Sequence, residues 1–322
     1  MKILIYSKNI KLPDKDRYIA LGVFDGVHLG HQKLIRSTVD KAKKNNGISI
    51  VITFEPHPDK IIIPGNNIFL LTTLKEKINL INDLNVDILL IIRFTKKISG
   101  MSPKDFVSKI LVDDLKVKEL FVGFNYKFGF QGSGNIECLK KYGKIYNFKT
   151  NIVKPEIIEN TVISSTKIKE YISLGDMEKA KKFLGHNLII SGKVVPGKRR
   201  GKNLLNFATA NIDIPSEKIM PANGVYLVKI TINNKKYYGL MNIGTRPTFN
   251  ERNRTVEIHI LDFNQSIYNK YLNIEMLHKI RDEKYFPNAI LLKKQIEKDI
   301  LIARNIIDKR NSMIEIQKID KW

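Results

Sequence analysis

The stretch from Gly22 to His31 holds two histidines in the spacing H-x-G-H and three glycines, at positions 22, 26 and 30. Its pattern predicts a buried strand end, a tight turn and a helix start. A helix N-terminus attracts phosphate, and the glycines Gly26 and Gly30 let the backbone approach a ligand closely. His28 and His31 can donate to phosphate oxygens without a permanent charge. These residues favour binding of a nucleotide triphosphate, although a plain tight turn with exposed imidazoles has the same pattern.

The elements around this stretch follow a regular alternation. Strand and helix patterns take turns over residues 18–22, 32–45, 48–54, 74–84, 86–92, 103–112 and 120–123. Such alternation predicts an α/β fold with a Rossmann-like, doubly wound parallel sheet. Ligands bind beyond the carboxyl ends of the strands in such sheets. We therefore expect segments 24–31, 55–58 and 123–134 to gather at that edge.

Residues 164–186 have the pattern of two short helices. Ser164 and Ser165 are capping candidates for the first, and the second begins near Gly175 and ends at Gly185. We place the domain boundary here, which predicts one domain over 1–186 and another over 187–322.

The second half of the chain has a different pattern. Strand-like segments lie at residues 188–195, 224–232, 237–243, 256–261 and 272–280. Asn233 and Asn234 are typical of a hairpin turn between two of them. The set predicts a small antiparallel β-barrel, followed by a C-terminal helix from about Asn288.

Composition narrows the class of protein. The chain has 322 residues, 55 Lys and Arg against 32 Asp and Glu, a net charge of +23 and a single cysteine, Cys138. One cysteine excludes an intramolecular disulfide and a cysteine-based zinc cluster. We expect a soluble, cytoplasmic protein, because neither a signal peptide nor an apolar run of about 20 residues is visible. The lysines are dispersed, which favours a solvated surface over nucleic-acid or membrane binding.

Four motifs of the first half resemble the bacterial bifunctional riboflavin kinase/FMN adenylyltransferase family. They are G-x-F-D-G-x-H-x-G-H from Gly22, T-F-E-P-H-P from Thr53, G-F-N-Y-K-F-G from Gly123 and I-S-S-T-K-I-K from Ile163. The resemblance implies transfer of AMP from ATP to FMN, which yields FAD and pyrophosphate. It implies catalytic roles for His28 and His31 and a flavin contact for Asn125. It further implies that ATP phosphates are bound by Gly22, Phe24, Asp25, Gly26, Gly30, Ser164, Ser165, Thr166 and Lys169.

The second half resembles the riboflavin kinase part of the same family. The matching segments include F-A-T-A-N from Phe207, N-I-G-T-R-P-T-F from Asn242, V-E-I-H from Val256 and K-I-R from Lys279. The resemblance implies phosphoryl transfer from ATP to the ribityl hydroxyl of riboflavin, with Glu257 as catalytic base and Arg281 at the flavin or nucleotide site. Thr209 and Asn211 would hold Mg²⁺, since oxygen ligands suit a hard cation. The implied phosphate loop contains Gly197, Arg200 and Gly201.

The chain departs from the family pattern at a few positions. Lys169 and Lys167 stand where the family has arginine, and a lysine keeps the charge but loses the two-pronged fork. Asn206 and Ala208 replace the glycine and proline of G-F-P-T-A-N. We expect both activities to survive, with riboflavin, FMN, FAD and ATP as the small-molecule partners. There are two alternatives to a bifunctional enzyme. The chain retains only one of the two activities, or it is a basic nucleic-acid-binding protein. Neither the oligomeric state nor a role for residues 311–322 follows from the sequence.

Overall fold

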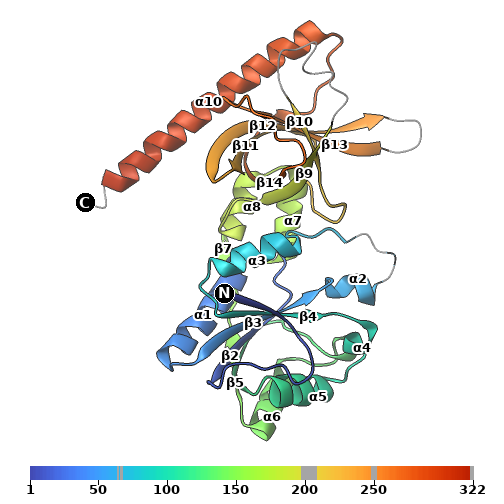
Figure 1. The fold of residues 1–322 in the computed structure, drawn as a ribbon, viewed down its shortest axis with the longest axis vertical. Coiled ribbons are helices and arrows are strands. Elements are labelled where there is room, and N and C mark those ends of the chain that lie inside the picture. The colour runs from blue at the N-terminus through green and yellow to red at the C-terminus, as the bar shows by residue number, and fades with distance from the viewer. Residues whose placement is uncertain (64, 66–67, 197–208, 248–251, 320–322) are drawn as a thin grey trace. The chain divides into compact units, whose positions relative to one another are not determined.

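The chain folds into two compact units in a computed structural model that describes residues 1–63, 65, 68–196, 209–247 and 252–319 (Figure 1). The first unit comprises residues 1–168 and 183–185, and the second comprises 169–182 and 186–322. Residues 169–182 thus group with the second unit. The domain limits 1–186 and 187–322 stay a prediction, because contacts within the chain do not test whether each part folds alone.

A six-stranded parallel sheet forms the centre of the first unit, in the order β1-β4-β3-β2-β5-β6. The strands are β1 (Lys2–Ile5), β2 (Arg17–Leu21), β3 (Ile48–Glu55), β4 (Ile88–Arg93), β5 (Val117–Gly123) and β6 (Lys149–Val153). The predicted doubly wound sheet is confirmed. β1 and β6 were not predicted from the sequence, because they are short and only partly buried.

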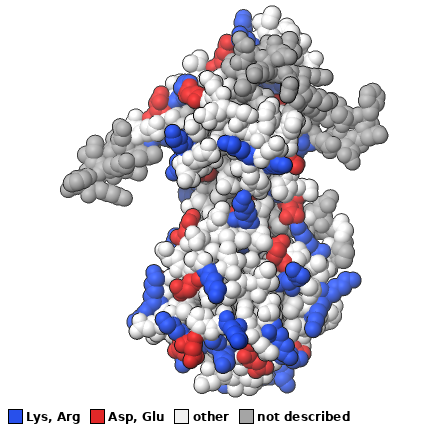
Figure 2. Space-filling model, in the orientation of Figure 1, with Lys and Arg blue, Asp and Glu red and all other residues white. Residues whose placement is uncertain are grey.

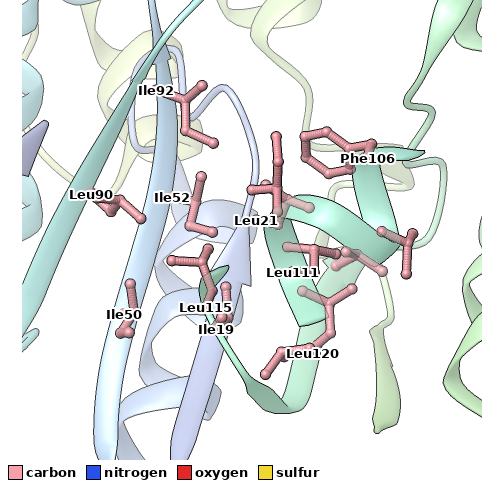
Figure 3. Packing of buried hydrophobic residues seen from close by; sticks show 14 of the residues in the cluster. Ile19, Leu21, Ile50, Ile52, Leu90, Ile92, Phe106, Leu111, Leu115 and Leu120 are labelled. Carbon is pink, nitrogen blue, oxygen red and sulfur yellow. The ribbon is translucent and has the colours of Figure 1, made fainter. Parts of the chain in front are cut away.

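Successive residues of each strand contribute to two separate cores. Ile19 and Leu21 belong to one cluster with the helix η1 (Phe106–Asp114), while Tyr18 and Ala20 belong to another with α1 (Leu29–Lys44). Figure 3 shows the first cluster, where isoleucines and leucines of β2, β3 and β4 meet Phe106 and Leu111. Each such side chain contributes about 1.5–3 kcal/mol by leaving water. The sheet is therefore held rigid from both faces.

The remaining helices of the first unit are short. They are α2 (Pro58–Ile62), α3 (Leu74–Asn82), α4 (Lys96–Ser99), α5 (Pro103–Asp105), the 3-10 helix η2 (Phe130–Gly132) and α6 (Ile136–Tyr146). The helix predicted over 103–112 is a short α-helical turn followed by the π-helix η1. A two-stranded ribbon of β7 (Ile157–Ile158) and β8 (Thr161–Val162) precedes α7 (Ser165–Leu174) and α8 (Met177–Leu184).

The order in which strands are added to the sheet reverses between β2 and β5. From β2 the chain proceeds to β3 on one side, and it returns later to β5 on the other. Gly22 directly follows β2, and Gly123 is the last residue of β5. Because the two strands are neighbours, the turn that leads to His28 and the segment that contains Asn125 leave the sheet side by side. This switch point is the place where open α/β sheets bind ligands.

The second unit is a closed antiparallel barrel in the order β10-β13-β12-β11-β14-β9. Its strands are β9 (Ile189–Val195), β10 (Ala210–Asp213), β11 (Gly224–Ile232), β12 (Lys235–Pro247), β13 (Arg252–Ile260) and β14 (Tyr271–Asp282). The predicted barrel is confirmed, as is the hairpin at Asn233 and Asn234, whose φ angles of 49° and 62° are left-handed. The sequence analysis missed the four-residue β10.

The helix α10 (Ala289–Ile319) packs on the outside of the barrel (Figure 1). Val225 and Leu227 join Ala303 in one buried cluster. Tyr226 lies between Val225 and Leu227 on β11, and side chains alternate between the two faces of a strand. Tyr226 therefore points to the other side of β11, where it is fully buried. No helix in the described part of the chain is long and apolar enough to cross a membrane.

Candidate active sites

His28 and His31 form a stacked pair at the start of α1. His28 is the N-cap residue, and its Nδ1 accepts a hydrogen bond of 3.3 Å from the backbone N–H of His31. The two rings stack with centroids 3.5 Å apart, and the ring of Phe24 lies edge-on to His31 at 5.3 Å. Because Nδ1 of His28 accepts this hydrogen bond, the N–H of the ring is on Nε2. His28 therefore offers an N–H donor at a helix N-terminus.

The turn before α1 has an unusual backbone. Phe24 and Val27 have φ angles of 55° and 41°, and both side chains are buried. Left-handed conformations of non-glycine residues cost about 1–3 kcal/mol and persist where the surroundings impose them. Gly26 has a φ of 86°, and a Cβ there would lie 2.6 Å from Leu71. Packing around Phe24, Gly26 and Val27 thus imposes the left-handed backbone of this turn.

Hydrogen bonds from distant segments hold the turn in place. The backbone N–H of Thr72 donates to Asp25 Oδ1 at 3.1 Å, and Gly26 N–H donates to the Thr72 hydroxyl at 3.0 Å. Ser165 Oγ donates to the Asp25 carbonyl at 3.0 Å. Asp25 was predicted to bind ATP. In the structure its carboxylate accepts a hydrogen bond from Thr72 and so stabilises the turn. A Cβ at Gly30 would lie 3.3 Å from the His28 ring, so a larger residue there would press against that ring.

Burial lowers the pKa of His31 well below its ordinary value, and the nearby His28 and Lys77 lower it further. His31 is therefore neutral at pH 7. Burial also lowers the pKa of Lys77, while Asp25 and Glu55 oppose that shift. The sequence analysis did not identify Lys77, because a single lysine in a lysine-rich chain carries no signal of burial.

The other residues predicted for this site lie at the ends of β5 and α7. Asn125 is exposed, two residues after β5. Ser164 Oγ accepts from the Lys167 N–H at 3.3 Å and so caps α7, while Thr166 is exposed in its first turn. Lys169 lies on the same helix but groups with the second unit. The structure thus brings Gly22, Asp25, His28, His31 and Ser165 together and leaves the role of Lys169 a prediction.

A cavity of about 570 Å³ lies between the barrel and α10. It is lined by three predicted residues, Thr209, Glu257 and Arg281, which are far apart in sequence. Its apolar part includes Val225, Leu240, Phe286, Leu292 and Ile296. Asn242, His259 and Asp299 also line it; the first two stand in the quoted motifs, but none of the three was assigned a role from the sequence. An apolar cavity with a few convergent polar groups is typical of a small-molecule site.

Strand register aligns three polar residues across the barrel. Glu257 on β13 pairs directly with Asn211 on β10 and with Asn242 on β12. Directly paired residues share one face of a sheet. Glu257 therefore lies between two amide side chains on the face that borders the cavity.

Arg281 is held by a buried carboxylate. Its Nε lies 3.1 Å and 2.9 Å from the two oxygens of Asp299, whose exposed fraction is 1%. Gln295 Nε2 also donates to Asp299 at 2.8 Å, and the Arg281 guanidinium lies 5.6 Å from the centre of the Phe286 ring. The arginine is thus fixed in one orientation at the cavity.

Five residues of interest lie outside the described residues: Gly197, Arg200, Gly201, Asn206 and Ala208. Within the described part of the chain, no cluster of three or more His, Cys, Asp or Glu residues could hold a metal ion.

Figure 2 shows that lysines and arginines on one face of the first unit are interspersed with aspartates and glutamates.

Known proteins resemble the chain along most of its length. Residues 11–167 match a family model described as FAD synthetase, and residues 184–307 match one described as riboflavin kinase. Bifunctional riboflavin kinase/FMN adenylyltransferase of Buchnera aphidicola (strain APS) is 38% identical over 94% of this chain and 97% of its own. The Escherichia coli K12 protein of the same description is 32% identical over 94% of this chain and 97% of its own.

A solved structure shares the whole fold. It is described as a macrolide-efflux protein from Streptococcus pneumoniae, and it superposes with a TM-score of 0.86 at 29% identity. The match covers 95% of this chain and 99% of the other. The order of parallel sheet, antiparallel barrel and C-terminal helix is therefore common to both chains.

Proposed function

The chain belongs to the family of bifunctional riboflavin kinases/FMN adenylyltransferases, and on that premise we propose which of its residues perform each reaction. The enzyme phosphorylates riboflavin to FMN and adenylylates FMN to FAD. We assign FMN adenylylation to the His28–His31 turn of the first unit and riboflavin phosphorylation to the cavity of the second. The alternatives of a single surviving activity or of a nucleic-acid-binding protein are set aside by the match to both family models.

In the second unit, Glu257 is the base for phosphoryl transfer. It accepts the proton of the ribityl hydroxyl as the oxygen of that hydroxyl bonds to the γ-phosphorus and the bond to ADP breaks. Its pairing with Asn211 and Asn242 is the observation that carries this assignment. The apolar lining of the cavity suits the flavin ring, and Arg281, fixed by Asp299, orients it.

The residues around Glu257 also fit a magnesium ion. Thr209 contributes a hydroxyl at the cavity, and Asn211 contributes an amide oxygen on the same face as Glu257. Neutral oxygen donors with few carboxylates suit Mg²⁺, which keeps several waters and shares phosphate oxygens of the nucleotide. When bound, the ion neutralises charge on the ATP phosphates.

In the first unit, the His28–His31 turn binds the ATP phosphates. The FMN phosphate oxygen attacks the α-phosphorus while the bond to pyrophosphate breaks, so the protein needs no nucleophile of its own. The Nε2–H of His28 and the N-terminal N–H groups of α1 donate to the phosphate oxygens. The hydroxyls of Ser164 and Thr166 at the start of α7 provide further donors, while Ser165 acts on the turn through its hydrogen bond to the Asp25 carbonyl.

The test is chromatography of the flavins formed from ATP, Mg²⁺ and either riboflavin or FMN, with wild type, Glu257→Gln and His31→Gln. Glu257→Gln should form FAD from FMN but nothing from riboflavin. His31→Gln should accumulate FMN from riboflavin and form little FAD. If each variant loses both reactions, or neither, the division of residues between the reactions is wrong.

A further inference from the structure

Lys77 is a buried lysine beside the His28–His31 turn. Only 4% of the residue is exposed, and its Nζ donates to the Val23 carbonyl at 2.9 Å. The Thr53 hydroxyl donates to the same carbonyl at 2.9 Å and lies 3.5 Å from the Lys77 Nζ. Lysine is almost never fully buried unless it is paired. The ammonium is therefore fixed at one backbone carbonyl, at the point where the turn leaves β2.

The start of α3 determines where Lys77 lies. Thr73 and Glu76 form a capping box, in which Thr73 N–H donates to Glu76 Oε2 at 2.9 Å and Glu76 N–H donates to Thr73 Oγ1 at 3.3 Å. This arrangement orders the first helical turn, and Lys77 follows it directly. Thr72, just before the box, holds Asp25 of the turn. The start of α3 thus holds the first half of the turn at Val23 and at Asp25.

The charge of Lys77 affects the protonation of His31, and nearby carboxylates affect the charge of Lys77. His28 and Lys77 act on His31, and both lower its pKa in addition to burial. Asp25 and Glu55 act on Lys77 and favour its charged form, against the effect of burial. The ammonium of Lys77 therefore opposes protonation of His31. A neutral His31 can stay stacked on His28, since two imidazolium rings would repel each other.

We propose that Lys77 is a positioning residue for adenylyl transfer, which fixes the Val23 carbonyl at the head of the turn and places a positive charge beside the His28–His31 pair. The inference rests on the proposed role of that pair in adenylyl transfer. Lys77 acts through the backbone and through His31, so it touches neither substrate. The charge helps to keep the His31 imidazole neutral.

The test uses two variants of the full chain that differ in what they remove. Lys77→Met removes the charge and the donor, whereas Lys77→Gln removes the charge but keeps a donor for Val23. Lys75→Met, an exposed lysine on the same helix, is the matched control. For each chain, FAD formation from FMN is measured across the pH range of histidine titration, and the His31 pKa is measured by NMR with labelled histidine. Riboflavin kinase activity of the same chain reports correct folding of the second unit.

Both Lys77 variants should raise the His31 pKa, because a nearby positive charge is removed. Lys77→Met should lower kcat/KM for FMN adenylylation about tenfold or more, the scale expected when reacting groups are misplaced. Lys77→Gln should lose less, and Lys75→Met should match wild type. A merely structural role would lower the rate equally at every pH and leave the His31 pKa unchanged in Lys77→Gln, which would overturn the proposal.

Two outcomes separate this inference from the proposed function. If His31→Gln lowers FAD formation while both Lys77 variants behave as wild type, the inference alone is wrong. If His31→Gln forms FAD normally, the proposed role of the histidines fails, and the inference fails with it. If Lys77→Met does not give folded protein, the His31 pKa in Lys77→Gln decides the question alone.

Discussion

Asn211 and Glu257 are direct partners on adjacent antiparallel strands, so the amide and the carboxylate lie on the same face of the barrel. The pairing joins residues 46 positions apart in sequence into one local arrangement. The proposed base, the proposed oxygen ligand and the apolar cavity thereby lie next to one another. The kinase chemistry of the second unit depends on this register.

Glu257→Gln should reduce riboflavin phosphorylation by about 10²-fold or more, because general-base catalysis contributes on this scale and the amide cannot accept the proton. FMN adenylylation in the same chain should be unchanged, which serves as the control for folding. Chromatography of FMN formed from riboflavin measures the effect. A smaller loss than tenfold would show that the hydroxyl proton is taken by another group.

His28→Asn separates the structural role of His28 from its chemistry. Asparagine is as good an N-cap residue, so the free energy of unfolding should stay within about 0.5 kcal/mol of wild type. The ring N–H donor is lost, and FAD formation from FMN should fall about tenfold or more. His28→Ala should lose the cap as well and be less stable by about 1 kcal/mol. Denaturant unfolding and flavin chromatography measure the two effects separately.

The low pKa of His31 predicts how stability depends on pH. The unfolded chain binds a proton at His31 near pH 6.5, whereas the folded chain binds it only at much lower pH. Below about pH 6.5 the unfolded state therefore binds more protons, and stability falls as the pH falls. Thermal unfolding at a series of pH values measures this slope. The slope should be shallower in His31→Gln, and an equal slope would show that other groups cause it.

Asp299→Asn should weaken riboflavin binding by the kinase. The change leaves a largely buried Arg281 without its carboxylate, which costs about 3–5 kcal/mol in stability. KM for riboflavin should rise about tenfold, because the guanidinium loses its fixed orientation, while KM for FMN in adenylylation stays the same. Arg281→Met combined with Asp299→Leu should recover most of the stability but not the affinity for riboflavin. Recovery of both would show that the pair is only structural.

Thr209→Val removes a proposed magnesium ligand while it keeps the shape of the side chain. The Mg²⁺ concentration that gives half-maximal riboflavin phosphorylation should rise about tenfold, the scale of changes at metal sites. The Mg²⁺ requirement of FMN adenylylation should not move. An unchanged requirement in both reactions would remove Thr209 from the ion's ligands.

Local patterns predicted much of this fold. The hairpin at Asn233 and Asn234 follows from residues that tolerate left-handed φ, and the buried strands follow from runs such as residues 48–54. β10 escaped prediction because its four residues carry no period that distinguishes a strand from a loop. The π-helix over Phe106–Asp114 also escaped, because its apolar spacing resembles that of an α-helix.

The site was predictable only where residue types carry chemistry locally. His28, His31 and Glu257 stand in motifs, and the structure places them in the turn and at the cavity. Lys77 and Asp299 are charged residues on helices, where solvent exposure is the ordinary expectation. Their burial depends on which strands and helices pack together, and that is decided by the tertiary fold.

The barrel is closed by its shortest strand. β10 joins β13 through two residue pairs and β9 through three, whereas β11 and β12 share nine. We expect transient opening of the barrel to begin at this seam, where it would separate Asn211 from Glu257. Amide hydrogens of Ala210–Asp213 should exchange with deuterium faster than those of β11. A nucleotide bound at Asn211 and Glu257 should slow this exchange, and such slowing would show that the reactants hold the two strands together.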